Sequence, residues 1–159
     1  MNLQETYQNN IELLKKRNIN FKEFDHEPVF DYEAIEVIRK KFNLTGVESK
    51  NLFLKTKDNR YYVFVTTQNK RADFNKLKEL LGTKVSLASK EDLKEQTGCE
   101  PGCAVPFGFN EDIIIIVDKE VFNHEKFVYS PGPPEKSIEI TTKDLKIIFD
   151  NLKNKVIFL

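Results

Sequence analysis

The sequence has only two cysteines and, although it is rich in charged residues, no net charge. Cys99 and Cys103 have no further cysteine or nearby histidine that would complete a four-ligand set, which argues against a structural zinc site. The 25 basic residues are balanced by 25 acidic residues, so the chain lacks the global positive field that holds a protein on bulk nucleic acid. Any contact with RNA must therefore use local patches of charge.

Long apolar runs are also absent. No stretch approaches the roughly 20 apolar residues that span a bilayer. The N-terminus (MNLQETYQNN) has neither the basic start nor the apolar run of a signal peptide. We therefore expect a cytoplasmic protein with reduced thiols and with no membrane partner, no metal and no cofactor.

The residues that are present suffice for one core. A chain of 159 residues with 40% hydrophobic content can bury well over half of the surface that it exposes when unfolded. The sequence contains no repeat, linker or low-complexity tract. We therefore expect residues 1–159 to form a single domain.

Hydrophobic periodicity predicts helices and strands in irregular order. Helices are expected over residues 2–17, from a cap at Asp31 to a break at Gly46, from Phe74 to Gly82, from Ser89 to Gly98, and from Thr141 or Thr142 to residue 152. Strands are expected at residues 20–25, 51–55, 61–67, 113–117, 127–129, 137–140 and 156–159. A doubly wound parallel sheet requires a regular alternation that is missing here, so we predict an α+β fold with a mixed β-sheet surrounded by helices.

The segment from Gly98 to Gly108 is the most unusual in the chain. It holds three glycines and two prolines in eleven residues, between a predicted helix and the buried strand 113–117. This composition predicts a rigid loop that presents backbone N–H groups to a ligand, and such groups stabilise an oxyanion. An ordinary tight connection is the alternative interpretation.

Several charged residues are candidates for anion binding. Lys50 opens the apolar strand 51–55, so its ammonium group is expected at the end of the sheet, where it either binds an anion or is a solvated gatekeeper. Lys70 and Arg71 form a basic pair that either contacts RNA phosphates or is ordinary solvated surface.

The usual nucleophiles and bases show no local pattern of catalysis. Neither His26 nor His124 has a sequence-local serine or cysteine partner, so both are expected to be structural or surface residues. Cys99 and Cys103 have no cationic neighbour within the loop that would lower a thiol pKa, so packing is the simpler role.

Taken in order, several motifs resemble the YbaK/ProX family of aminoacyl-tRNA editing domains, relatives of the insertion domain of bacterial prolyl-tRNA synthetases. The matching segments are His26–Val29, Lys50–Lys55, Lys70–Asp73, Gly98, Pro101–Gly102 and Val105–Gly108. The resemblance extends over nearly the whole chain and implies a mixed sheet surrounded by helices.

The resemblance implies an enzyme that acts in trans and hydrolyses the ester of mischarged tRNA, most often alanyl-tRNA with the proline anticodon. Such editing is needed because a synthetase pocket gains only about 1–3 kcal/mol of discrimination from a missing methylene. The implied partners are the acceptor end of an aminoacyl-tRNA and a prolyl-tRNA synthetase, with the protein a monomer or weak dimer.

The resemblance also assigns roles to residues. Lys50 is expected to hold the terminal phosphate or ribose oxygens, and Asn51 to orient the substrate by hydrogen bonding. The loop at Gly102, Cys103 and Ala104 is expected to bind the ester carbonyl oxygen while a water, aided by the ribose hydroxyl, attacks. The further substrate-binding residues are His26, Thr67, Lys70, Arg71, Gly98, Pro101, Ser130 and Gly132.

One segment departs from the alanine-specific pattern. Family members of that type carry a histidine-proline pair followed by asparagine and threonine, where this chain has Tyr129-Ser130-Pro131-Gly132. The segment looks closer to YbaK-like members, some of which act on cysteinyl-tRNA. The family implies Ala-tRNA(Pro) as the expected substrate, and this departure adds Cys-tRNA(Pro) or another aminoacyl-tRNA as an alternative. A non-catalytic module that binds tRNA or a synthetase is a further alternative.

Overall fold

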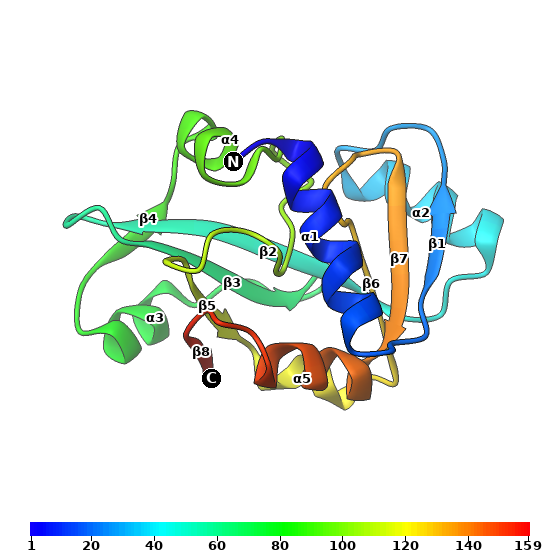
Figure 1. Ribbon diagram of the computed structural model, residues 1–159. Helices are drawn as coiled ribbons and strands as arrows, with labels where there is room; N and C mark the ends of the chain where they lie inside the picture. The colour runs from blue at the N-terminus through cyan, green and yellow to red at the C-terminus, as the bar shows by residue number, and fades with distance from the viewer.

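The computed structural model describes residues 1–159, which fold into one mixed β-sheet with five α-helices (Figure 1). The strands are β1 Lys22–Asp25, β2 Val47–Thr56, β3 Tyr61–Thr67, β4 Val85–Leu87, β5 Ile114–Val117, β6 Lys126–Tyr129, β7 Lys136–Thr141 and β8 Val156–Phe158. The helices are α1 Leu3–Lys16, α2 Tyr32–Phe42, α3 Phe74–Leu81, α4 Lys90–Thr97 and α5 Thr142–Asp150, with a 3₁₀-helix at Lys119–Asn123. No helix is long and apolar enough to cross a membrane.

The strand order is β1-β7-β6-β2-β3-β5-β8, and β4 pairs with the far end of β2. Four pairings are antiparallel, whereas β2 with β6, β3 with β5 and β5 with β8 are parallel. The predicted mixed sheet is therefore confirmed, with β2 and β3 at its centre. Strand β5 is fully buried at Ile115, Ile116 and Val117, as expected for a strand covered on both faces.

Strand β2 joins two halves of the sheet that separate along its length. It pairs with β6 only through Val47 and Glu48, and with β4 only through residues 54–56. Residues 49–53 therefore have a strand partner only on the β3 side. The sheet is open at this point, and side chains and loops from elsewhere in the chain can reach the middle of β2.

Alternation along β2 and β3 divides the core into two apolar clusters. Phe53 and Val63 belong to the larger cluster, together with Leu14 of α1 and Leu145 of α5, whereas Leu54 belongs to the smaller one. In Figure 1, α1 runs across the front of the sheet between β2 and β7. Each fully buried side chain of this size contributes roughly 1.5–3 kcal/mol, so the faces of β2 are set by core packing.

Two local expectations were wrong. Helix α2 ends at Phe42, and Asn43 takes the left-handed cap conformation at φ +53°, because asparagine tolerates this region and the helix needs no glycine there. Gly46 instead lies against β6, where an added Cβ would approach the Lys126 backbone to 3.0 Å. Lys50 does not open its strand either: it is the fourth residue of β2, opposite Thr66. Pairing with β6 extends β2 toward its N-terminus, and no local pattern shows that.

Candidate active site

A cavity of about 170 Å³ lies where the sheet opens beside β2, and we call it the β2 cavity. Its walls come from the start of α2, from β2, from the loop between α4 and β5, and from the β6–β7 connection. Six of the predicted site residues line it together: Lys50, Asn51, Gly102, Cys103, Ala104 and Ser130.

Asn51 connects β2 to the glycine-rich loop. Its Nδ2 donates to the Ala104 carbonyl oxygen at 2.9 Å and to Ser49 Oγ at 3.2 Å. Its Oδ1 is buried and has no hydrogen-bond partner. A buried acceptor left unpaired costs roughly 1–3 kcal/mol, so this oxygen marks a position where a ligand donor would be stabilised.

Where the glycine-rich loop lines the cavity, two of its peptide N–H groups have no partner. Gly102 has φ +89° and packs so closely on the Phe30 carbonyl oxygen that an added Cβ would lie 2.4 Å from it. The backbone N–H groups of Gly102 and Ala104 have no hydrogen-bond partner within the chain. The N–H of Cys103 is already used, because it donates to the Glu100 carbonyl oxygen at 3.0 Å. Of the three peptides predicted to bind the ester oxygen, two are therefore available.

Helix α1 holds the far end of this loop. Asn10 Nδ2 donates to the Phe107 carbonyl oxygen at 2.7 Å, and Asn10 Oδ1 accepts from the Tyr129 hydroxyl at 2.9 Å. Asn10 and Tyr129 are both fully buried. The loop is thus tied down by buried hydrogen bonds, in agreement with the rigidity that its composition predicts.

Neither cysteine is placed for nucleophilic chemistry. Burial raises the pKa of the Cys103 thiol to about 12, and this thiol donates to the Val29 carbonyl oxygen at 3.2 Å. Burial also raises the pKa of Cys99 above its ordinary value. Both side chains remain protonated thiols near neutral pH, so packing is their role.

The charges around the β2 cavity are uneven. Lys50 and Lys136 are its cations, and Glu48 is the only carboxylate in its walls. Lys50 Nζ donates to the Lys70 carbonyl oxygen at 3.3 Å on the exposed side, whereas Lys136 forms an ion pair with Asp25. Ligands with a negative group at the rim are therefore favoured by Lys50, whose ammonium has no carboxylate partner.

Glu48 and Arg39 form a buried ion pair beside the cavity. Arg39 Nη1 donates to Glu48 Oε2 at 3.1 Å, and the side chain of Glu48 is 8% exposed. Burial raises the pKa of Glu48 to about 7, although Arg39 acts in the opposite direction. This carboxyl group therefore titrates near neutral pH.

His26 contacts a cavity residue that sequence reasoning missed. Its Nε2 lies 2.8 Å from Ser137 Oγ, and its Nδ1 lies 2.7 Å from the Glu27 carbonyl oxygen. Because a carbonyl oxygen only accepts, Nδ1 carries a proton, and in the neutral imidazole Nε2 then accepts from the Ser137 hydroxyl. Ser137 lines the cavity and is brought to His26 by the pairing of β1 with β7, which no local motif reveals.

Two predicted site residues lie elsewhere. Thr67 and Lys70 line a separate hollow of about 300 Å³. Lys70 Nζ forms ion pairs with Asp118 and Glu120, each at 2.9 Å. The charge of Lys70 is largely compensated there. Neither Thr67 nor Lys70 lines the β2 cavity, and Lys70 is linked to it only through its backbone carbonyl oxygen, which accepts from Lys50.

The other four predicted residues lie outside the cavity walls. Gly98 ends α4 at φ +73°, where an added Cβ would lie 2.2 Å from the Leu3 nitrogen, so close packing explains the glycine. Gly132 is buried behind Ser130 and donates to its Oγ at 3.2 Å. Pro101 and Arg71 are exposed, and Arg71 has no ion-pair partner.

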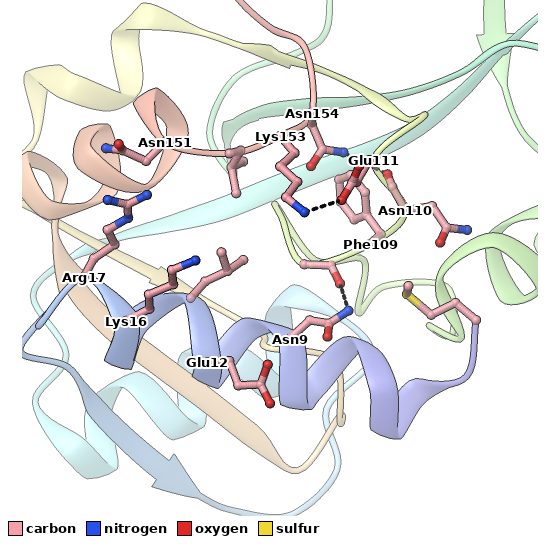
Figure 2. A pocket seen from close by; sticks show the side chains of 14 residues that line it. Asn9, Glu12, Lys16, Arg17, Phe109, Asn110, Glu111, Asn151, Lys153 and Asn154 are labelled. Atoms are coloured by element: carbon pink, nitrogen blue, oxygen red, sulfur yellow. Dashed lines mark hydrogen bonds and ion pairs between the residues drawn. The ribbon is translucent and has the colours of Figure 1, made fainter.

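A larger hollow of about 490 Å³ contains none of the predicted site residues. Figure 2 shows it between α1 and the segments 108–111 and 151–154, with Lys16 and Arg17 on one side and Lys153 on the other. Lys153 is paired with Glu111 at 3.2 Å. Its walls are mostly amides and exposed charges and offer no unpaired buried acceptor, so the β2 cavity is the better candidate site.

The sequence matches the family model described as "Aminoacyl-tRNA editing domain" over residues 26–148, which include every residue of the β2 cavity. The chain belongs to the aminoacyl-tRNA editing domain family. The predicted family is thereby confirmed, as is the expected class of enzyme, an aminoacyl-tRNA deacylase.

Individual relatives agree with this assignment. The chain is 30% identical over 155 residues to the multifunctional Ser/Thr-tRNA deacylase ProXp-y of Escherichia coli strain K12, covering 94% of this chain and 92% of that protein. The fold matches the crystal structure of a hypothetical protein with a TM-score of 0.79 at 20% identity, covering 94% and 97% of the two chains. It also matches a candidate trans-editing enzyme for prolyl tRNA synthetase with a TM-score of 0.74 at 21% identity, covering 97% and 96%.

Proposed function

We propose that this deacylase hydrolyses the ester of a small amino acid at the acceptor end of mischarged tRNA, with the aminoacyl group in the β2 cavity. The observation that supports this most directly is the convergence of Lys50, Asn51 and the free peptides of Gly102 and Ala104 on one cavity of about 170 Å³. This volume is below the roughly 300–1,000 Å³ of sites for drug-sized ligands. A small aminoacyl group fits such a space, while the nucleotide stays at the rim.

The free peptides account for the chemistry. In the proposed reaction the ester carbonyl oxygen accepts hydrogen bonds from Gly102 and Ala104, which strengthen as water attacks and the oxygen becomes negative. Removing one donor of this kind typically costs about 10²–10³ in kcat. The water oxygen bonds to the carbonyl carbon, the bond to the ribose oxygen breaks, and that oxygen takes the proton that the attacking water loses. A free amino acid and uncharged tRNA are released.

The other cavity residues position the substrate. Lys50 is proposed to hold the terminal phosphate or a ribose oxygen, and Asn51 Oδ1 to accept a hydrogen bond from the substrate. The adjacent ribose hydroxyl is suited to assist the water, because it stands next to the ester. Holding the reacting groups in this geometry supplies much of the rate acceleration, so no protein nucleophile is required.

Alanine is the first amino acid that we propose, carried by the proline tRNA. A seryl or threonyl ester is the second candidate, for a specific reason. When the Ser137 hydroxyl donates a hydrogen bond to His26, the lone pairs of Ser137 Oγ are left to accept one from a hydroxyl group of the substrate in the cavity. The similarity to a Ser/Thr-tRNA deacylase supports the same candidate. A cysteinyl ester remains a third option.

The family supports a proposal for the setting of the reaction. We propose that residues 1–159 act as one editing domain in the cytoplasm, on tRNA charged by a prolyl-tRNA synthetase. A monomer or weak dimer suffices, because all the proposed groups come from one chain.

A deacylation panel tests the proposal. Alanyl-, seryl-, threonyl-, cysteinyl- and prolyl-charged tRNA are incubated with the protein and with the variants Lys50→Ala and Lys57→Ala. Lys57 lies in the exposed β2–β3 turn and serves as the matched control. We expect hydrolysis of one small ester, lost in the Lys50 variant and retained in the control. Binding of every tRNA without hydrolysis would instead support the non-catalytic module.

A further inference from the structure

Glu48 has one carboxylate oxygen that the protein leaves unused. The side chain is 8% exposed and lines the β2 cavity, where it is the only acid. Oε2 accepts from Arg39, but Oε1 has no hydrogen-bond partner within the chain. Oε1 is not sealed inside the protein, since Asn51 Oδ1 is the one fully buried side-chain oxygen without a partner, so Oε1 is open to a ligand in the cavity.

The ion pair with Arg39 does not by itself explain this residue. Arg39 Nη2 already donates to the Gly46 carbonyl oxygen at 2.6 Å, and its Nε lies 3.8 Å from Glu36. Glu48 accepts from Arg39 through one oxygen only, whereas arginine and carboxylate groups often form a bidentate pair. The pair therefore leaves Oε1 available to another group.

The substrate supplies the missing partner. An aminoacyl ester carries an α-ammonium group on the carbon next to the reacting carbonyl. The remaining charged groups of the cavity, Lys50 and Lys136, repel it. Glu48 is therefore the one ionic partner within the walls, and it lies two residues before Lys50, on the same face of β2.

We propose that Glu48 binds the α-ammonium group of the substrate and thereby restricts the site to esters of free amino acids. This inference rests on the proposed function of the β2 cavity. It predicts that esters with an acylated nitrogen, as in peptidyl-tRNA, are rejected, because an amide nitrogen carries no charge to compensate the carboxylate.

The first test uses the unaltered protein and three esters on one tRNA. Alanyl-tRNA is compared with N-acetylalanyl-tRNA and with lactyl-tRNA, in which a hydroxyl replaces the amine; the seryl series replaces them if the panel selects serine. Charge-assisted hydrogen bonds contribute roughly 1.5–3 kcal/mol, so we expect kcat/KM for both analogues to be about 10- to 100-fold lower. Equal rates on all three esters would overturn the proposal, whereas no hydrolysis of any ester would overturn the proposed function instead.

The second test uses the isosteric variant Glu48→Gln with Glu36→Gln as its control. Glu36 is the other carboxylate beside Arg39, but its side chain is 55% exposed and does not line the cavity. We expect Glu48→Gln to lose about 10- to 100-fold in kcat/KM on the free ester and nothing on the lactyl ester, so that the preference disappears. Glu36→Gln should keep it. A Glu48→Gln enzyme that folds, by circular dichroism, and retains the preference would contradict the assignment.

Discussion

Asn51 donates from Nδ2 to the Ala104 carbonyl oxygen over 2.9 Å, across 53 positions of sequence, and so fastens strand β2 to the glycine-rich loop. The same amide group leaves Oδ1 buried without a partner. One side of the amide thus builds the site and the other is open to a ligand. This division separates effects on stability from effects on activity.

Replacing Asn51 by alanine should reduce activity more than stability. The variant loses the hydrogen bond to Ala104 but also removes the unpaired buried oxygen, so the free energy of unfolding should fall by only about 1 kcal/mol. We expect kcat/KM for deacylation to fall at least about tenfold, the equivalent of about 1.4 kcal/mol. Urea unfolding and deacylation kinetics measure the two quantities. A loss confined to stability would show that Asn51 only fastens the loop.

Replacing Gly102 by alanine should distort the loop. The new Cβ would lie 2.4 Å from the Phe30 carbonyl oxygen, at a backbone φ of +89° that disfavours side chains. Strain of this kind costs of order 1–3 kcal/mol, and we expect deacylation to fall as the peptide N–H groups move. Gly82→Ala is the control, since Gly82 has φ +71° but nothing within 4 Å of the added atom. Thermal unfolding should show a larger loss for Gly102→Ala, and equal losses would contradict the contact with Phe30.

Glu48 should make stability depend on pH. Its pKa is raised from 4.5 to about 7 in the folded protein, so the folded state binds this proton more tightly than the unfolded chain does. Its contribution to stability is therefore complete below pH 4.5 and is lost as the pH rises through 7. The shift corresponds to roughly 3 kcal/mol.

Glu48→Gln removes this titration. The variant should match the parent protein near pH 4.5 and be more stable above pH 7, by up to roughly 3 kcal/mol. Chemical unfolding at several pH values measures the difference. Glu36→Gln should show no such gain, and a Glu48→Gln variant that is less stable at pH 8 would disprove the assigned pKa.

His26 and Ser137 should act as one unit. His26→Ala frees the Ser137 hydroxyl from its fixed direction, and Ser137→Ala removes the oxygen from the cavity wall. We expect each single variant to lose roughly tenfold in kcat/KM and the double variant to lose little more, because neighbours in one network are not additive. His124→Ala is the control, as His124 is exposed. Independent, additive losses would contradict a shared role.

Local chemistry accounts for the elements that the sequence predicts. Asp31 and Ser89 cap their helices as expected, each through a backbone N–H three residues on. The apolar run that ends at Val117 forms a buried strand because five residues are too few for a helix. The short strand β4 was missed, since its three residues carry no pattern and depend on pairing with β2.

Some features of the site were likewise predictable from the sequence, and others depend on the fold. Its family, its enzyme class and the presence of Lys50, Asn51 and the loop in one site are properties of ordered motifs, which are contiguous in the chain. Which groups face the cavity was decided only by the fold. Strand pairing brings Ser137 to His26 over 111 positions, and the opening of the sheet beside β2 leaves Glu48 among the residues that line the cavity. Sequence alone determines local conformation through neighbouring residues, whereas hydrogen bonds and charges between distant segments exist only once the backbone has closed around them.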